Sequence, residues 1–243
     1  MDADYAEQMD TLVARYKEAE GPLMKLANYA GSQIEGIFST LPEGFESQIQ
    51  SIVKRALDTA YEASGTISAS RLAPTTPSYF HKLAVTVSGA VGGVAGLPGA
   101  MAELPVTITT MFSSFQKIAE EYGFDPKVQE TKLECIKIFS MGGPLEKDED
   151  IDLSFVSARL GLQGEFVSQL ISKATQKLAL VISQKLGSQS VPIIGAVTGA
   201  TLNYTFMSYY EEMAHVRFGL KRLQNEYPES QPLEEFIELY EAA

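Results

Sequence analysis

Two long stretches of this 243-residue sequence carry no charged side chain, and they set the tightest limit on how the chain can fold. The first covers residues 83–102 and the second covers residues 188–210. Crossing a membrane takes roughly 20 residues, so both are long enough. The first, however, is mostly Gly, Ala, Ser and Thr, and the second contains Gln189, Asn203 and three tyrosines. Such side chains suit a crowded interior of helix against helix better than contact with lipid.

The residues that flank the two stretches point the same way. Lys82 alone precedes the first stretch and Glu103 follows it, while Glu211 and Glu212 follow the second. Membrane-spanning helices usually have Lys and Arg beside them on the cytoplasmic side. We therefore expect both stretches to lie buried within the protein, and the resting chain not to span a membrane.

Glycine spacing predicts how the two stretches pack. Glycines lie four residues apart at 89 and 93, at 92 and 96, and at 195 and 199. That spacing leaves one helix face clear, so that another backbone can approach it closely. Each stretch also leads into an apolar helix with a polar end, and we expect the first of these helices to end at Tyr122-Gly123. We predict two Gly-rich helical hairpins that pack against each other at the centre of the fold.

The rest of the sequence favours helices. Residues 2–20 place apolar side chains at steps of three and four, and similar patterns follow at about 22–40, from about 43, after Asp125-Pro126, from 163 to Leu186 and at 232–241. Gly187 is the expected C-terminal cap of the long helix. No segment shows the alternation of a strand. These patterns predict an all-α fold, a single multi-helix domain.

A stretch rich in Ser, Thr, Ala and Pro, residues 63–78, reads as the main linker. We therefore expect an N-terminal helical extension over residues 1–75, followed by an all-α domain over residues 76–243 that holds the two Gly-rich hairpins.

The charge balance and the single cysteine limit the compartment and the partners. A net charge of −12 argues against nucleic acid, which needs clustered Lys and Arg. It also disfavours broad adhesion to anionic lipid. One cysteine, Cys135, excludes a disulfide framework and fits a reducing compartment. The first ten residues have no basic or apolar region typical of a signal peptide. We expect a cytoplasmic protein without nucleic acid partners.

Glu212 and His215 are the first candidates for a site. They are three residues apart and so share a helix face, a spacing that di-iron carboxylate bundles use twice. Here it occurs once, because no Glu stands at that spacing from the other histidine, His81. A charge pair on the helix surface is the simpler interpretation. We expect no metal and no cofactor.

Glu103 is the second candidate, since it is the one charged residue between positions 83 and 116. A buried carboxylate is costly unless it is paired or hydrogen-bonded. Glu103 either caps a helix that begins near Pro105, or it faces a polar pocket with Arg217 or His215 as its partner. The candidate ligand-binding residues are thus Glu103, Glu212, His215 and Arg217.

Other candidate motifs lack the residues that their chemistry requires. The acidic run at 148–152 lacks the Gly and Glu that a calcium loop requires at its sixth and twelfth positions. The Gly-rich run at 89–99 contains no Gly-Lys-Ser or Gly-Lys-Thr, and Gly-x-Ser-x-Gly does not occur. Apolar neighbours predict that Cys135 is an inert buried thiol. The sequence therefore names no catalytic residue.

Several short motifs, in order and at their spacing, resemble the EcsC family of bacterial proteins between about Ser78 and Tyr227. They are the Gly-rich opening at 88–93, Glu-Leu-Pro at 103–105, IAEEYGFD at 118–125, VPIIG at 191–195, and Ala214 with Phe218, Arg222 and Leu223. The family is named for a gene beside an ABC transporter operon linked to secretion. The resemblance brings no activity and no catalytic residue with it.

We expect a non-enzymatic cytoplasmic helical interaction protein with a protein partner, acting at a membrane or with an ABC transporter or secretion system. Two alternatives stay open. One is a membrane-inserting protein whose Gly-rich hairpins are hidden in the resting form. The other is a metal- or ligand-binding enzyme centred on Glu103, Glu212 and His215.

Overall fold

The computed structural model describes residues 3–19, 21, 44–63, 96–140, 164–189 and 199–242. Within these residues all regular secondary structure is helical, which confirms the predicted all-α fold. The helices are α1 (Ala3–Ala19), α3 (Phe45–Ala63), α6 (Gly96–Glu121), α7 (Gln129–Ser140), α9 (Gly164–Gln189), α10 (Gly199–Glu226) and α11 (Pro232–Glu241). The predicted helix at about 22–40, the linker, the turns of the two hairpins, His81 and the acidic run at 148–152 lie outside the described residues.

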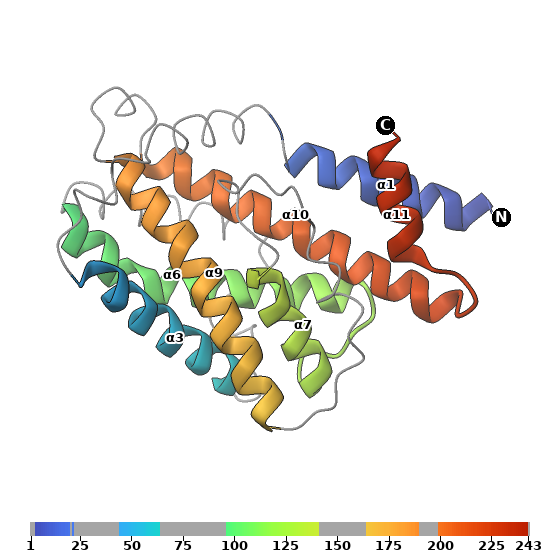
Figure 1. The fold of residues 1–243 in the computed structure, drawn as a ribbon. Helices are drawn as coiled ribbons and strands as arrows, with labels where there is room; N and C mark the ends of the chain where they lie inside the picture. The colour runs from blue at the N-terminus through green and yellow to red at the C-terminus, as the bar shows by residue number, and fades with distance from the viewer. Residues whose placement is uncertain are drawn as a thin grey trace.

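Helix α10 runs through the middle of the fold (Figure 1). On one side it packs against α1 and α11, and on the other against α6 and α7. Helices α3 and α9 cover α6 and α7 in turn. Because α6 and α10 are the helices into which the two uncharged stretches lead, their direct contact agrees with the expectation that these parts of the chain pack together.

The centre of the core lies where α6, α7 and α10 meet. Phe115, Phe139 and Tyr210 form an aromatic cluster there, with ring centroids 4.9 Å apart for the two phenylalanines and 5.8 Å apart for Phe139 and Tyr210. Helix α7 is enclosed on all sides, since every residue from Leu133 to Phe139 is buried. A helix buried all round must bring its polar side chains into the interior with it.

The N-terminal helix α1 is packed into the same body. Tyr16 of α1 meets Phe236 and Tyr240 of α11 edge to face, with centroids 5.7 and 4.9 Å away. Leu12 lies against Gly219 of α10, where an added Cβ would come within 3.0 Å of Leu12 Cδ1. The absence of a side chain at this glycine therefore allows α1 to approach α10 closely.

Helix ends agree with the sequence in some places and differ in others. Gly123 has φ +85° and Phe124 N–H donates to the Ala119 carbonyl at 2.9 Å, a glycine C-cap where the sequence predicted the end of α6. The predicted start near Pro105 is wrong, because α6 begins at Gly96 and contains Pro105. An internal Pro costs ~3 kcal/mol. Buried Leu104, Ile108, Met111 and Phe112 outweigh that cost by joining the core on both sides of the proline.

Gly187 does not end α9 as predicted, since the helix continues to Gln189. A glycine within a helix costs only about 1 kcal/mol relative to alanine, so it weakens a helix without ending it. Across the described part of the chain, none of the helices has the length and apolar character needed to cross a membrane.

Candidate functional site

Three neighbouring faces of α10 carry ionisable side chains, and each face joins α10 to a different helix. Ser114 of α6 donates to Glu211 Oε1 at 2.7 Å. Arg15 of α1 donates to Glu212 Oε2 at 2.8 Å. Arg217 Nε donates to Glu134 Oε2 of α7, also at 2.7 Å. The polar residues of α10 therefore connect it to α6, α1 and α7.

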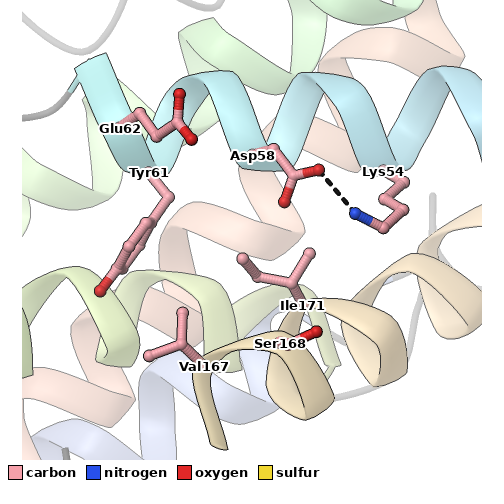
Figure 2. Close-up of a pocket in the computed structure, with 7 residues that line it drawn as sticks. All are labelled: Lys54, Asp58, Tyr61, Glu62, Val167, Ser168 and Ile171. Atoms are coloured by element: carbon pink, nitrogen blue, oxygen red, sulfur yellow. Dashed lines mark hydrogen bonds and ion pairs between the residues drawn. The ribbon is translucent and has the colours of Figure 1, made fainter. Parts of the chain in front are cut away.

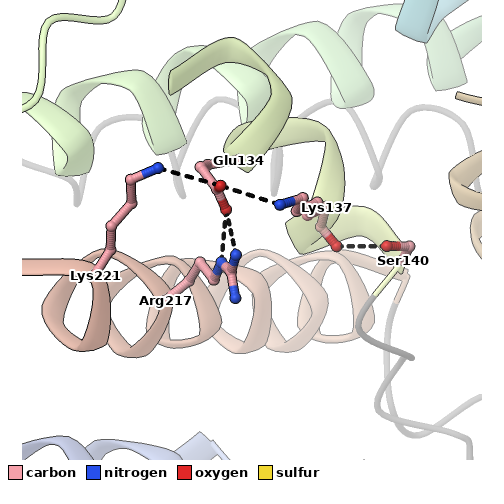
Figure 3. A network of polar contacts seen from close by, with 5 residues as sticks. All are labelled: Glu134, Lys137, Ser140, Arg217 and Lys221. Carbon is pink, nitrogen blue, oxygen red and sulfur yellow. Dashed lines mark hydrogen bonds and ion pairs between the residues drawn. The ribbon is translucent and has the colours of Figure 1, made fainter. Parts of the chain in front are cut away.

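The connection to α7 is a buried cluster of one carboxylate and three cations (Figure 3). Glu134 Oε2 lies 2.6 Å from Arg217 Nη2, and its Oε1 lies 3.1 Å from Lys137 Nζ and 3.3 Å from Lys221 Nζ. The side chains of Glu134, Lys137 and Arg217 are at most 9% exposed, whereas that of Lys221 is 28% exposed. Figure 3 shows the three cations approaching Glu134 from different directions.

The surrounding cations set the protonation of Glu134. Burial alone would raise the pKa of its carboxyl, but Arg217, Lys137 and Lys221 outweigh burial and lower that pKa from 4.5 to about 2. Burial lowers the pKa of Lys137 below its ordinary 10.5, with Glu134 acting against this shift. Glu134 is therefore ionised at neutral pH and serves as the shared acceptor of the cluster.

The connection to α1 includes Tyr122, which lies just past the end of α6. Its ring meets the His215 ring edge to face, with centroids 5.8 Å apart, and the Arg222 guanidinium lies 5.4 Å from the same ring. Burial raises the pKa of the Tyr122 hydroxyl, although Arg15 and Arg222 act to lower it. Arg222 also donates to Gln8 of α1. His215 thus faces an aromatic ring at the junction of α1, α6 and α10.

The structure does not bring Glu103 to the other three candidates. Glu103 is half-buried on α6, where Thr107 Oγ1 donates to its carboxylate at 3.4 Å. At the ordinary rise of a helix, the backbone positions of Glu103 and Tyr122 are about 28 Å apart. His215 lies against the Tyr122 ring, so it is also far from Glu103. Arg217 binds Glu134 instead. On α10, Glu212 and His215 both lie at the junction with α1, where Arg15 pairs with Glu212 and Tyr122 meets His215. Arg217 faces α7 instead.

The residues that the structure describes contain neither a cluster of metal ligands nor an accessible thiol. No group of three or more His, Cys, Asp or Glu side chains there is placed to hold a metal ion. Cys135 is fully buried, and burial raises the pKa of its thiol well above the ordinary 9.0. The predicted burial of this cysteine is therefore confirmed, and its thiol is poorly reactive in the folded protein.

A groove between α3 and α9 offers an open site of about 220 Å³ (Figure 2). Asp58 and Tyr61 project from α3 toward α9, and Val167 and Ile171 project from α9 toward α3. Lys54 Nζ pairs with Asp58 Oδ2 at 2.7 Å along one side. The full lining is Lys54, Asp58, Tyr61, Glu62, Val167, Ser168 and Ile171.

Sequence reasoning missed both the groove and the carboxylate partner of Arg217. Glu134 and Lys137 stand in an otherwise apolar run, Leu133 to Phe139, and this is a signal that could have marked them as a buried pair. The groove has no such signal. Its two walls come from segments more than a hundred residues apart, and each wall alone is an ordinary amphipathic helix.

These features define an all-α bundle built around one long helix whose polar side chains hold its neighbours. The chain belongs to the EcsC protein family, whose model matches residues 7–223. The match includes most of α1 and all of α3, so it begins well before the motifs that carry the resemblance in the sequence. No curated protein and no solved structure matches the chain.

Proposed function

We propose that this protein is a non-enzymatic helical interaction protein that binds a protein partner through the groove between α3 and α9. The groove is the observation that carries the proposal. It combines an apolar base, Val167 and Ile171, with an aromatic ring and charged side chains at its edge. Mixed linings of this kind are typical of surfaces that bind a partner by a few inserted side chains.

The use of the ionisable residues elsewhere supports binding over catalysis. Arg217 is committed to Glu134, and Glu212 to Arg15, so these side chains hold helices together. The groove itself places a hydroxyl, Ser168, on a wall whose neighbours are Val167 and Ile171, without a histidine in the lining. Such a hydroxyl can donate a hydrogen bond to a partner.

The proposal places this activity in the cytoplasm, with the partner at a membrane or in a transporter assembly. A photo-crosslinking amino acid at Ser168, introduced in the native host, tests it. Gln176, also exposed on α9 but outside the lining, is the matched control position. We expect one defined crosslinked protein from position 168 and none from position 176.

Filling the groove supplies the second half of the test. Val167→Trp places a large ring between α3 and α9 at a half-buried position, and it should abolish the crosslink from position 168 while the protein keeps its helical circular dichroism. Equal crosslinking from both positions, or a crosslink that survives the filled groove, would refute the proposed binding surface.

A further inference from the structure

We infer that the groove between α3 and α9 receives the side chain of a lysine or arginine from the protein partner. This inference rests on the proposed function, because it assigns the chemistry of the partner at that surface. Three properties of the groove support this inference: its size, the apolar and acidic groups that line it, and the Glu62 carboxylate, which no cation in the described part of the chain pairs with.

The size fits one side chain. Pockets that enclose small-molecule ligands usually measure ~300–1,000 Å³. At about 220 Å³ this groove is smaller, and it lies open between two helices. One extended side chain from another protein would occupy it without displacing either helix.

The apolar groups lie where the stem of such a side chain would pass. Val167 and Ile171 face the ring of Tyr61 across the space in Figure 2. Lysine and arginine bury their methylene stems against apolar surface while their charged ends stay near water. Lys132 of α7 already lies 5.9 Å from the centroid of the Tyr61 ring. We therefore assign the stem, and not the charged end, of the incoming side chain to that ring.

The groove also carries two acidic groups, both on α3. Asp58 and Glu62 are one helical turn apart on α3, and both line the groove. Asp58 is held by Lys54, with side chains 36% and 56% exposed. No cation in the described part of the chain pairs with the Glu62 carboxylate. An added ammonium or guanidinium group would pair with it, whereas an anion would be repelled there.

The recognition is tested by nuclear magnetic resonance of the Val167 and Ile171 methyl groups. The probes are the Nα-acetyl amides of lysine, arginine and norleucine, the last having a similar stem without the charge. We expect the lysine and arginine probes to shift both methyl signals and to bind about fivefold more tightly than the norleucine probe, the upper range for a partly exposed ion pair.

Glu62→Gln should remove that preference, because it deletes the unpaired charge and keeps the shape. Glu46→Gln, an exposed position at the other end of α3, is the matched control and should leave the preference unchanged. Equal affinity for lysine and norleucine in the unmodified protein would overturn the inference. So would a lysine preference that persists in Glu62→Gln.

The crosslink from position 168 separates this inference from the proposed function. If the crosslink forms equally in the unmodified protein and in Glu62→Gln, the groove binds a partner but not through a basic side chain, and only the inference fails. If no crosslink forms while the lysine probe binds, the proposed function fails, and the groove takes free amines in place of a partner's side chain. A crosslink that weakens about fivefold in Glu62→Gln supports both.

Discussion

Replacing Arg217 with methionine would measure how much the buried cluster around Glu134 contributes to stability. Methionine keeps much of the volume of arginine and removes its charge. Removing one partner of a buried ion pair usually costs ~3–5 kcal/mol, because the other charge is left buried and uncompensated. Here Lys137 and Lys221 stay within 3.1 and 3.3 Å of the same carboxylate. We therefore expect the lower end of that range, about 3 kcal/mol.

The assay is urea unfolding at pH 7, followed by helical circular dichroism and analysed at constant slope. Lys54→Met is the matched control, because it removes a cation from the exposed pair with Asp58. Exposed pairs contribute ~0–1 kcal/mol, so the control should lie near the unmodified protein. Both substitutions exchange a long cationic side chain for methionine on a helix, and they differ chiefly in burial.

A loss of less than about 1 kcal/mol in Arg217→Met, similar to that in the control, would refute the reasoning. It would mean that the two lysines alone satisfy the buried carboxylate. Combining Arg217→Met with Glu134→Gln checks the cause, since Arg217→Met should cost less stability in the Glu134→Gln background, where the carboxylate it pairs with is already gone, than in the unmodified protein. Strict additivity of the two substitutions would show that the side chains do not interact.

Three further predictions follow from contacts described above. Because the pKa of Glu134 is lowered to about 2 in the folded protein, its contribution to stability is full above pH ~4.5 and is lost as the pH falls toward 2. The stability difference between the unmodified protein and Glu134→Gln, measured by urea unfolding from pH 6 to 2.5, should therefore shrink as the pH falls. A constant difference would contradict the assigned pKa. Gly219→Leu should lower the free energy of unfolding by ~1–3 kcal/mol, since a side chain there meets Leu12, with Cδ1 3.0 Å and Cγ 3.3 Å from the new Cβ; an unchanged melting temperature would mean that α1 moves aside without cost. Cys135 should react with a thiol reagent only in step with global unfolding in urea, and fast labelling of the native protein would show that α7 opens locally.

Much of the helical framework could be predicted because each helix carries its own signal. The last helix was expected at 232–241 and is found at Pro232–Glu241, where a first-turn proline and buried Phe236 mark it locally. The end of α6 was also local, because Gly123 supplies the left-handed conformation that a C-cap requires. The predicted helix start near Pro105 and helix end at Gly187 were wrong because the packing of neighbouring apolar residues outweighs the local helix propensity of Pro and Gly.

The candidate site was harder because its contacts are not local. Arg217 was proposed as a partner of Glu103, but its carboxylate partner is Glu134, 83 residues away. The apolar run around Glu134 marks it as buried, but no local pattern pairs it with Arg217 among the many acidic residues. Glu103 looked exceptional because its neighbours in sequence are uncharged. Its own helix supplies a hydrogen bond from Thr107 one turn away, a local contact that does not depend on Arg217 or His215.

The ties that converge on α10 have a consequence for the order in which the protein assembles. Arg15 and Glu212 are 197 residues apart, Ser114 and Glu211 are 97 apart, and Glu134 and Arg217 are 83 apart. None of these three contacts can form until residues 211–217 have left the ribosome. Until then α7 holds an ionised carboxylate with only Lys137 nearby, and the apolar faces of α1 and α6 have no central helix to cover them. Apolar surface that stays uncovered on an incomplete chain promotes aggregation. We therefore expect the growing chain to need protection by holding chaperones until α10 emerges.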